Sequence, residues 1–161
     1  VLVYGLNFAG IQGKNNFTDR TAILALSGAY AGTTVYSVKH FTRHSRENPS
    51  LQRAFPSGHT TAAFAGAEFL AEEYGDQSIA YPIIGYSIAV ATGVFRMYNH
   101  DHWFSEVVAG AGVGILSTRL AYLTYPYIRK WFTHTDKNGK RMSFVPTYQN
   151  DTPGFAFTAQ F

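Results

Sequence analysis

The chain opens with a polar segment and continues into a long apolar one. Residues 1–17 are rich in Gly and Asn and indicate a loop or an incomplete helical turn. Residues 20–38 carry no charge after Arg20 and are rich in Ala, Leu, Gly and Tyr. Thr18 and Asp19 are residue types that favour the N-cap position of a helix. The pattern therefore predicts a helix over residues 20–38, long enough to be buried.

A second helix is predicted between residues 57 and 75. Phe64, Ala67 and Ala71 recur at spacings of three and four, which places them on one helical face. Glutamates indicate the solvent-facing side of the same stretch. Gly75 suits the position just past the helix end, because glycine readily adopts the left-handed backbone found there.

Three further helices are predicted beyond this point. The third covers residues 77–97, and the fourth begins near residue 101 and runs past residue 116. An apolar residue at every fourth position supports the fourth helix: Trp103, Val107, Ala111 and Ile115. Residues 120–132 are apolar with one proline and predict a short last helix. The expected fold is an all-α bundle of about five helices.

From about residue 133 the pattern changes from helical to extended. Residues 143–148 and 155–161 predict two strands, and the turn-forming residues between them predict a hairpin. The second predicted strand places aromatic residues on one face at a period of two: Phe155, Phe157 and Phe161. We therefore expect a helical domain over residues 1–132, followed by an extended tail or hairpin over residues 133–161.

Two uncharged windows raise the question of a membrane. Residues 21–38 and 77–95 are each long enough to cross a bilayer. Both also contain many Gly, Ser, Thr and Tyr residues, and the chain has few comparable windows. The pattern favours helices buried in a protein core, and the membrane interpretation stays open beside it.

Composition narrows the class of protein. A chain of 161 residues fits one domain, and its 46% hydrophobic content excludes a disordered tail. The absence of cysteine excludes a disulfide scaffold and a thiolate metal site. The net charge of +3 is too small, and the basic residues are too scattered, to indicate a nucleic-acid partner. Those basic residues remain available to a small anion.

The first candidate for chemistry is the run Pro56, Ser57, Gly58 and His59 at the start of the second predicted helix. Proline at a helix start costs no hydrogen bond. Ser57 and Gly58 place backbone N–H groups at the positive end of the helix, and Gly58 lets an anion approach the main chain. His59 stands one position deeper, where it can donate a proton to a leaving group. The run predicts a binding site for a phosphate group.

The second candidate is the pair His102 and Glu106, which are four residues apart and share a helical face. The carboxylate can accept the proton on one ring nitrogen, which leaves the other nitrogen as a nucleophile. Arg96 ends the preceding predicted helix, and Lys39 and Arg46 add positive charge. Cations beside two imidazoles suit a phosphoryl group, whose transition state spreads charge over its equatorial oxygens.

The remaining histidines give only weak signals for a metal. His40 and His44 are four residues apart, but no third ligand stands at a suitable spacing, so we predict no metal site there. His100, Asp101 and His102 are also consecutive residues of types that bind metal ions. We interpret Asp101 as a helix cap and His100 as a residue at the rim of the site.

These motifs together resemble the signature of the type-2 phosphatidic acid phosphatases, whose superfamily includes bacterial non-specific acid phosphatases and vanadium haloperoxidases. The signature has three blocks: Lys, six residues and Arg-Pro; then Pro-Ser-Gly-His; then Ser-Arg, five residues, His, three residues and Asp. The residues that match in order and spacing are Lys39, Arg46, Pro56, Ser57, Gly58, His59, Arg96 and His102. The resemblance covers about residues 20–120.

Three positions depart from that signature. No proline directly follows Arg46, and the next one is Pro49. Phe95 stands where the family has Ser, which removes a hydroxyl from the site. Glu106 stands where the family has Asp, and its longer side chain can still reach the imidazole.

The resemblance implies a helical bundle with the active site between its central helices. It implies that His102 attacks phosphorus and forms a phosphohistidine, while Glu106 orients the imidazole. It also implies that His59 protonates the leaving alkoxide and then activates water. The expected phosphate-binding residues are Lys39, Arg46, Ser57, Gly58 and Arg96. No metal and no other cofactor is implied.

The implied activity is the metal-independent hydrolysis of a phosphomonoester or pyrophosphate. The uncharged helices and abundant aromatic residues favour a lipid substrate, of the phosphatidate, undecaprenyl pyrophosphate or lipid A type, and contact with a membrane surface. One alternative is a soluble broad-specificity acid phosphatase that takes small phosphate esters. Another is a non-catalytic helical module that binds anionic headgroups. A vanadate-dependent haloperoxidase ranks lower, because those enzymes are typically far larger. By family analogy, the location is a bacterial cell envelope, periplasmic or membrane-associated.

Overall fold

The structure is a computed structural model that describes residues 2–42, 55–135, 141–149 and 152–159. Side chains are described for residues 2–42 and 55–131. The chain forms two compact units, Val1–Tyr122 and Leu123–Phe161.

Helices build the first unit, as the hydrophobic pattern predicts. The described residues contain α1 (Leu2–Phe8), α2 (Phe17–Phe41), α3 (Gly58–Tyr74), α4 (Ala80–Tyr98) and α5 (Phe104–Phe132). The expected all-α bundle of about five helices is therefore confirmed.

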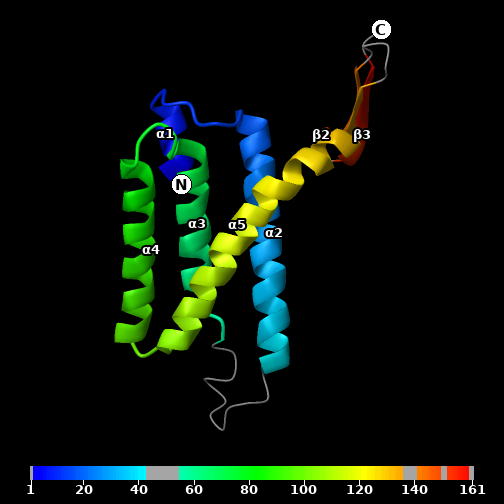
Figure 1. The fold of residues 1–161 in the computed structure, drawn as a ribbon. Helices are drawn as coiled ribbons and strands as arrows, with labels where there is room; N and C mark the ends of the chain where they lie inside the picture. The colour runs from blue at the N-terminus through cyan, green and yellow to red at the C-terminus, as the bar shows by residue number, and fades with distance from the viewer. Residues whose placement is uncertain (1, 43–54, 136–140, 150–151, 160–161) are drawn as a thin grey trace. The chain divides into compact units, whose positions relative to one another are not determined.

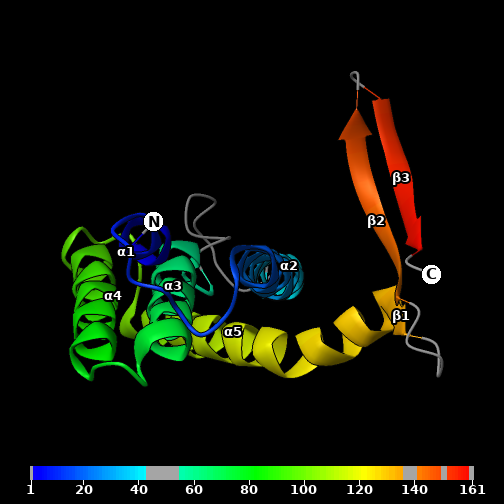
Figure 2. The ribbon, with the colours of Figure 1, turned by 90° about the horizontal axis from the view of Figure 1, so that it is seen from above.

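The helix α3 lies at the centre of the first unit. Figures 1 and 2 show α4, α3 and α2 side by side in one layer, with α5 crossing one face of the layer. The short helix α1 lies on the opposite face, near the C-terminal end of α3. Buried apolar side chains of α1 and α3 pack in this core, among them Val3, Ala67, Phe69, Leu70 and Tyr74.

The N-terminal region differs from its predicted form in two ways. A full helix, α1, occupies part of the segment expected to be a loop. The helix α2 begins at Phe17 because Asn16 is its N-cap, and the Asn16 side chain accepts a hydrogen bond from the Asp19 N–H at 2.8 Å. Thr18 and Asp19 therefore lie in the first turn, and the prediction that they cap the helix was wrong.

The helix α3 has the predicted limits, with a different role for its terminal glycine. Ser57 is the N-cap, and Gly75 is the C-cap in a right-handed conformation (φ −59°, ψ −35°). Gly75 is thus not the left-handed residue that was predicted. A Cβ atom at this position would lie 2.4 Å from the carbonyl oxygen of Ala71, so glycine is needed for close backbone approach.

The fourth and fifth predicted helices form one continuous helix. The helix α5 contains Pro126 and passes through the predicted break near residue 118. Within that stretch, Arg119 donates from Nε to Oε1 of the buried Glu68 on α3 at 2.6 Å, and Glu68 also accepts from the Tyr86 hydroxyl on α4. The pairing with Glu68 allows the charged Arg119 to lie within an otherwise apolar helix.

The helix α4 is not a buried core helix, so the favoured interpretation of its window was wrong. Its buried residues are Gly85, Ala89 and Gly93. Its large apolar side chains are mostly about half exposed or more: Ile83, Ile84, Ile88, Val90, Val94 and Phe95. In the described part of the chain, a single helix combines the length and hydropathy of a membrane span, and it is Phe104–Trp131 of α5. Neither predicted window lies in that helix.

The second unit ends in the predicted hairpin with one additional strand. The antiparallel sheet has the order β1 (Thr133–Thr135), β2 (Arg141–Gln149) and β3 (Thr152–Ala159). The register of β2 and β3 runs from Met142 opposite Ala159 to Gln149 opposite Thr152. The predicted aromatic face of the last strand lies outside the residues whose side chains the structure describes.

Candidate active site

The first turn of α3 presents the run from Ser57 to His59 at one end of the bundle. Ser57 is fully buried, and its Oγ accepts hydrogen bonds from the N–H (3.4 Å) and the Oγ1 (2.9 Å) of Thr60. Among the described residues, a Cβ atom at Gly58 would meet nothing within 4 Å, so this part of the structure leaves the main chain there accessible. His59 is exposed. The helix therefore offers an accessible positive end beside an imidazole.

The backbone N–H of Ser57 is engaged by the start of α5. It donates to the carbonyl oxygen of Glu106 at 3.0 Å. This hydrogen bond removes one of the two amide donors, Ser57 and Gly58, that the sequence assigns to phosphate binding. It also links the beginning of α3 to the beginning of α5.

His102 and Glu106 are in contact, although His102 precedes the helix. Nδ1 of His102 lies 2.9 Å from Oε2 of Glu106, and the same oxygen accepts from the Trp103 N–H at 3.1 Å. The Glu106 side chain is fully buried, and that of His102 is 12% exposed. Glu106 thus caps the start of α5 and holds the imidazole. With the Nδ1 proton on the carboxylate side, Nε2 keeps a lone pair for attack.

Close packing of glycines fixes α5 against α3. A Cβ atom at Gly110 would lie 2.6 Å from the Ser57 carbonyl oxygen, and one at Gly114 would lie 2.4 Å from the Thr61 carbonyl oxygen. Any larger residue would push the two backbones apart. The glycines therefore set the position of Glu106, and through it His102, relative to the first turn of α3.

Arg96, in the last turn of α4, is joined to the loop that carries His102. The N–H groups of Asp101 and His102 donate to the Arg96 carbonyl oxygen at 3.1 and 3.3 Å. The Arg96 guanidinium donates from Nη1 to Oδ2 of Asp101 at 2.8 Å. Asp101 thus holds this guanidinium. The prediction that Asp101 caps the helix was wrong, because α5 begins at Phe104. His100 is exposed with a positive φ of 59°, consistent with a place at the rim.

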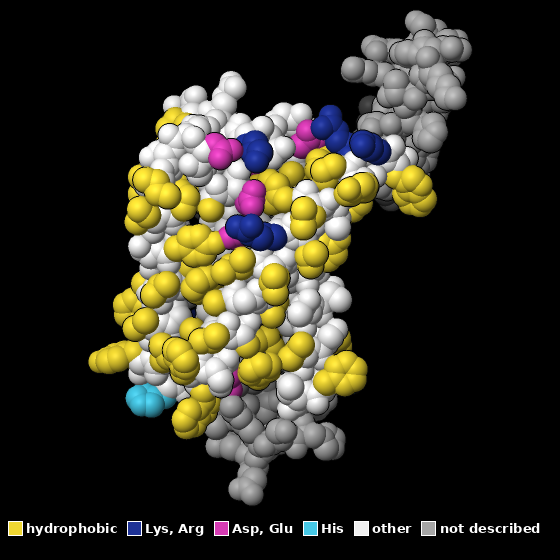
Figure 3. All heavy atoms as spheres, viewed as in Figure 1, with side chains coloured by type: hydrophobic (Ala, Val, Ile, Leu, Met, Phe, Trp, Pro, Cys, Tyr) yellow, Lys and Arg dark blue, Asp and Glu magenta, His cyan; other side chains and the backbone are white. Residues whose placement is uncertain are grey.

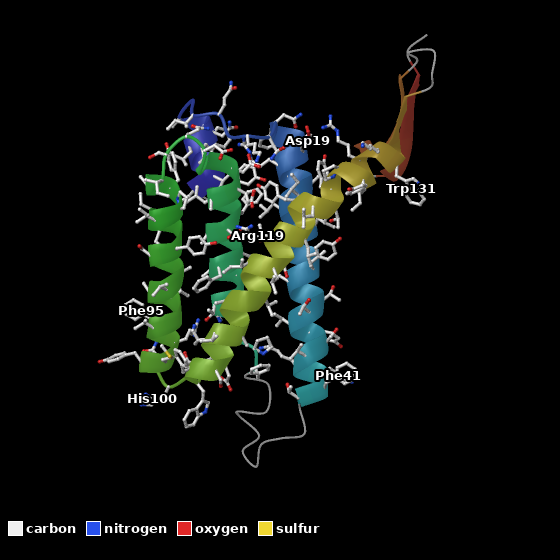
Figure 4. All side chains as sticks on the ribbon, in the orientation of Figure 1. Asp19, Phe41, Phe95, His100, Arg119 and Trp131 are labelled. Atoms are coloured by element: carbon white, nitrogen blue, oxygen red, sulfur yellow. The ribbon has the colours of Figure 1, made fainter. Side chains whose placement is uncertain are left out.

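The last turn of α2 reaches the same end of the bundle. Lys39 is half-buried in that turn. Figure 4 shows Phe41 of α2 at the end of the bundle where Phe95 and His100 also lie. Hydrogen bonds join Ser57 to Glu106, Glu106 to His102, and His102 to Arg96. Among the described residues, no hydrogen bond or ion pair joins Lys39 to this group. Arg46 and Pro49 lie outside the described residues, as does His44.

The sequence pattern did not identify the residues that join the motifs. Thr60 is fully buried against Ser57, and Gly110 and Gly114 provide the closest approach of α5 to α3. Small residues at a spacing of four are the one local signal that could have found the glycines. Across the described residues, no cluster of His, Asp and Glu has the form of a metal site.

Comparison with known proteins places these features in a family. Residues 18–130 match the PAP2 superfamily. The chain is 41% identical over 114 residues to the lipid A 1-phosphatase of Porphyromonas gingivalis, which covers 70% of this chain and 26% of that protein.

Two eukaryotic relatives match the chain more weakly. A probable lipid phosphate phosphatase 4 of Arabidopsis thaliana is 31% identical over 97 residues, 51% of this chain and 32% of that protein. A probable diacylglycerol pyrophosphate phosphatase 1 of Schizosaccharomyces pombe is 30% identical over 104 residues, 58% of this chain and 35% of that protein. The chain thus spans about a quarter to a third of each relative. No solved structure matches it.

Proposed function

Since the chain belongs to the PAP2 superfamily, we propose that it hydrolyses a phosphate ester or pyrophosphate of a lipid through a phosphohistidine. One observation carries the proposal: a buried Glu106 holds the imidazole of His102 beside the positive end of α3. A carboxylate that accepts the Nδ1 proton fixes the tautomer of the imidazole and the direction in which Nε2 points. This is the arrangement that an imidazole nucleophile needs.

The reaction proceeds in two displacements. In the first, Nε2 of His102 forms a bond to phosphorus, the bond to the leaving oxygen breaks, and His59 gives its proton to that oxygen. In the second, His59 takes a proton from water, the resulting hydroxide attacks phosphorus, and the P–N bond breaks to release phosphate. The Gly58 amide and the cations of Lys39, Arg46 and Arg96 stabilise the charge on the equatorial oxygens.

The exposed apolar surface supports a lipid as the substrate. Figure 3 shows hydrophobic side chains spread over the face formed by α4 and α5. On α5, Val108, Leu116 and Leu123 are each more than half exposed, and α4 contributes a comparable set. A contiguous apolar surface on this scale is typical of a protein that contacts a membrane or another protein.

The same surface supports a place in a membrane of the cell envelope. The helix α5 is long and apolar enough to cross a bilayer, and one third of its most apolar window is buried within the structure. The lipid A 1-phosphatase that resembles the chain comes from a bacterium. We therefore expect the full protein to stay with the membrane fraction after an alkaline carbonate wash. Its release into the supernatant would contradict this location.

The two alternatives find less support. A soluble acid phosphatase that takes small esters does not require the exposed apolar face of α4 and α5. A non-catalytic headgroup-binding module does not require a buried carboxylate that orients an imidazole. Both features fit a lipid phosphatase.

The test compares two substrates in the presence of a metal chelator. The full protein should release phosphate from a phosphatidate in mixed micelles and, more slowly, from p-nitrophenyl phosphate. His102→Ala should reduce both rates by at least about 10⁴-fold. His100→Asn is the matched control, because His100 lies in the same loop, is exposed, and has a left-handed backbone that asparagine accepts. Equal rates for wild type and His102→Ala would overturn the proposal.

A further inference from the structure

An apolar groove lies on the face of α3 that α5 does not cover. It has a volume of about 260 Å³ and is bordered by α1, α2, α3 and α4. Its lining includes Leu24 of α2, Ile88 of α4, and Ala62, Ala63, Gly66 and Leu70 of α3. In Figure 2, α1 and α5 lie on opposite sides of the layer formed by α2, α3 and α4.

Small residues on α3 make the floor of this groove. Ala62 and Gly66 are exposed even though α3 is the central helix of the unit. In the part of the chain that the structure describes, a Cβ atom at Gly66 would meet nothing within 4 Å, so the space above it is open there. By contrast, the opposite face of α3 is filled, because Thr61 and Glu68 contact α5 there. Small side chains on a central helix therefore create a channel and not a packing contact.

The groove begins on the face of α3 that also carries His59. Ala62, Ala63 and Gly66 are three, four and seven residues after His59, so all four positions share a helical face. One helical turn, about 5 Å, separates the level of His59 from the beginning of the groove. His59 itself is exposed on that face.

The chemistry of His59 determines which part of a substrate lies in this direction. A general acid must stand beside the oxygen to which it gives its proton. In the proposed reaction that oxygen belongs to the leaving lipid alcohol, so the lipid leaves the site on the His59 side. The groove begins on that same side and is lined mostly by apolar residues.

We propose that this groove holds an acyl chain of the leaving lipid, with the phosphate at His102 and the chain lying over Ala62 and Gly66. The inference rests on the proposed function, since it uses the role of His59. An acyl chain matches the narrow apolar lining and needs no hydrogen-bond partner within it. The alternative occupants, a helix from elsewhere in a longer chain or from a second copy, are outcomes of the test.

The helix α1 limits the length of chain that the groove accepts. Leu2, Val3 and Tyr4 close its far end, and the Tyr74 hydroxyl donates to the Val3 carbonyl oxygen at 3.1 Å, which holds α1 in place. From His59 to Leu70 the helix rises about 17 Å. Selectivity for acyl chains should therefore increase with length up to that span and then level off.

The test fills the groove at Gly66 and compares the effect with a matched glycine. Gly66→Leu places a side chain in the groove, whereas Gly112→Leu places one on α5, where a Cβ atom also meets nothing within 4 Å. The measured quantity is the ratio of kcat/KM for a long-chain phosphatidate to kcat/KM for p-nitrophenyl phosphate. We expect Gly66→Leu to lower this ratio about tenfold or more. Gly66→Ala should have a much smaller effect, and Gly112→Leu should leave the ratio unchanged.

Two kinetic results would overturn the groove proposal. One is an unchanged ratio in Gly66→Leu, which would indicate that another helix or a second copy covers the groove. The other is an equal loss on both substrates in a folded Gly66→Leu protein.

A binding measurement keeps the proposal testable if the wild-type protein has no phosphatase activity, a result that would count against the proposed function alone. A non-hydrolysable long-chain phosphonate should bind Gly66→Leu about tenfold more weakly than Gly112→Leu. Equal affinity for the two variants would contradict the proposal that the groove holds an acyl chain, and this result does not depend on catalysis.

Discussion

Two buried glutamates at opposite ends of α3 have very different surroundings. Glu73, in the last turn of α3, accepts hydrogen bonds from Arg20 Nε (3.1 Å), from the N–H (3.1 Å) and Nδ2 (2.6 Å) of Asn15, and from the Tyr122 hydroxyl (2.7 Å). Glu106, beside the first turn of α3, contacts the imidazole of His102. Both carboxylates are removed from solvent.

The comparison separates a structural carboxylate from one that we propose positions the nucleophile. The donors around Glu73 come from three parts of the chain and include a guanidinium that is itself buried, so this network stabilises the fold. The partner of Glu106 is an imidazole, which can act as a nucleophile or a base, and its side chain retains some exposure. Burial of a carboxylate is common to both ends, and the kind of partner determines the role.

The largest expected effect is on catalysis at Glu106. Glu106→Gln should reduce kcat on the order of 10³–10⁴-fold, because the amide cannot hold the imidazole in the tautomer needed for attack. The midpoint of thermal unfolding should change little. Steady-state kinetics and a thermal melt of the same preparation measure both quantities. A Glu106→Gln variant that unfolds readily but keeps its kcat would contradict the proposed difference between Glu106 and Glu73.

At the other end, Glu73→Gln should act on stability. Loss of the negative charge leaves the buried guanidinium of Arg20 uncompensated, which should lower the free energy of unfolding by about 3–5 kcal/mol. The kcat of the molecules that remain folded should be unchanged, since Glu73 lies at the far end of α3. Denaturant unfolding measures the first quantity, and active-site titration corrects the second. A large fall in kcat would show that the two ends are coupled.

A smaller effect is expected where α5 packs against α3. Gly114→Ala forces a Cβ atom against the Thr61 carbonyl oxygen, and the required shift should cost about 1–3 kcal/mol of stability. Because α5 carries Glu106, kcat should fall as well. Gly112→Ala is the control, since a Cβ atom there meets nothing. Equal effects of the two alanines would refute the role of close packing.

The smallest effect should come from one hydrogen bond of the Glu73 network. Tyr122→Phe removes the hydroxyl that donates to Oε1 of Glu73 and leaves the Arg20 pair intact. We expect a loss of about 1–2 kcal/mol in the free energy of unfolding and no change in kcat. A loss as large as that of Glu73→Gln would mean that the tyrosine, not the ion pair, stabilises this end.

The sequence predicted those parts of the fold that depend on local signals. The helix α3 has a serine cap and regular apolar spacing, and its predicted limits agree with the structure. The continuity of α5 could not be predicted, because Arg119 is held by Glu68, a residue about fifty positions away in the chain. The exposure of α4 was also missed, because the apolar composition of a helix is the same whether its side chains are buried or exposed.

The site shows the same division between local and distant signals. The contact of His102 with Glu106 follows from their spacing of four residues, even though His102 precedes the helix. The hydrogen bond from the Ser57 N–H to the Glu106 carbonyl oxygen joins distant segments and has no signature in either one. It also showed that one predicted phosphate donor is occupied, which no spacing could reveal.

The most direct test of the account is to trap the phosphoryl group on the chain. The wild-type protein, mixed with substrate and quenched rapidly in alkali, should carry a phosphoryl group on His102, detected by mass spectrometry of the peptide. With p-nitrophenyl phosphate, whose leaving group needs little protonation, His59→Ala should accumulate more of it, because the water that releases phosphate loses its general base. Turnover with no phosphoryl group on His102 in either protein, or on another residue instead, would contradict the central claim.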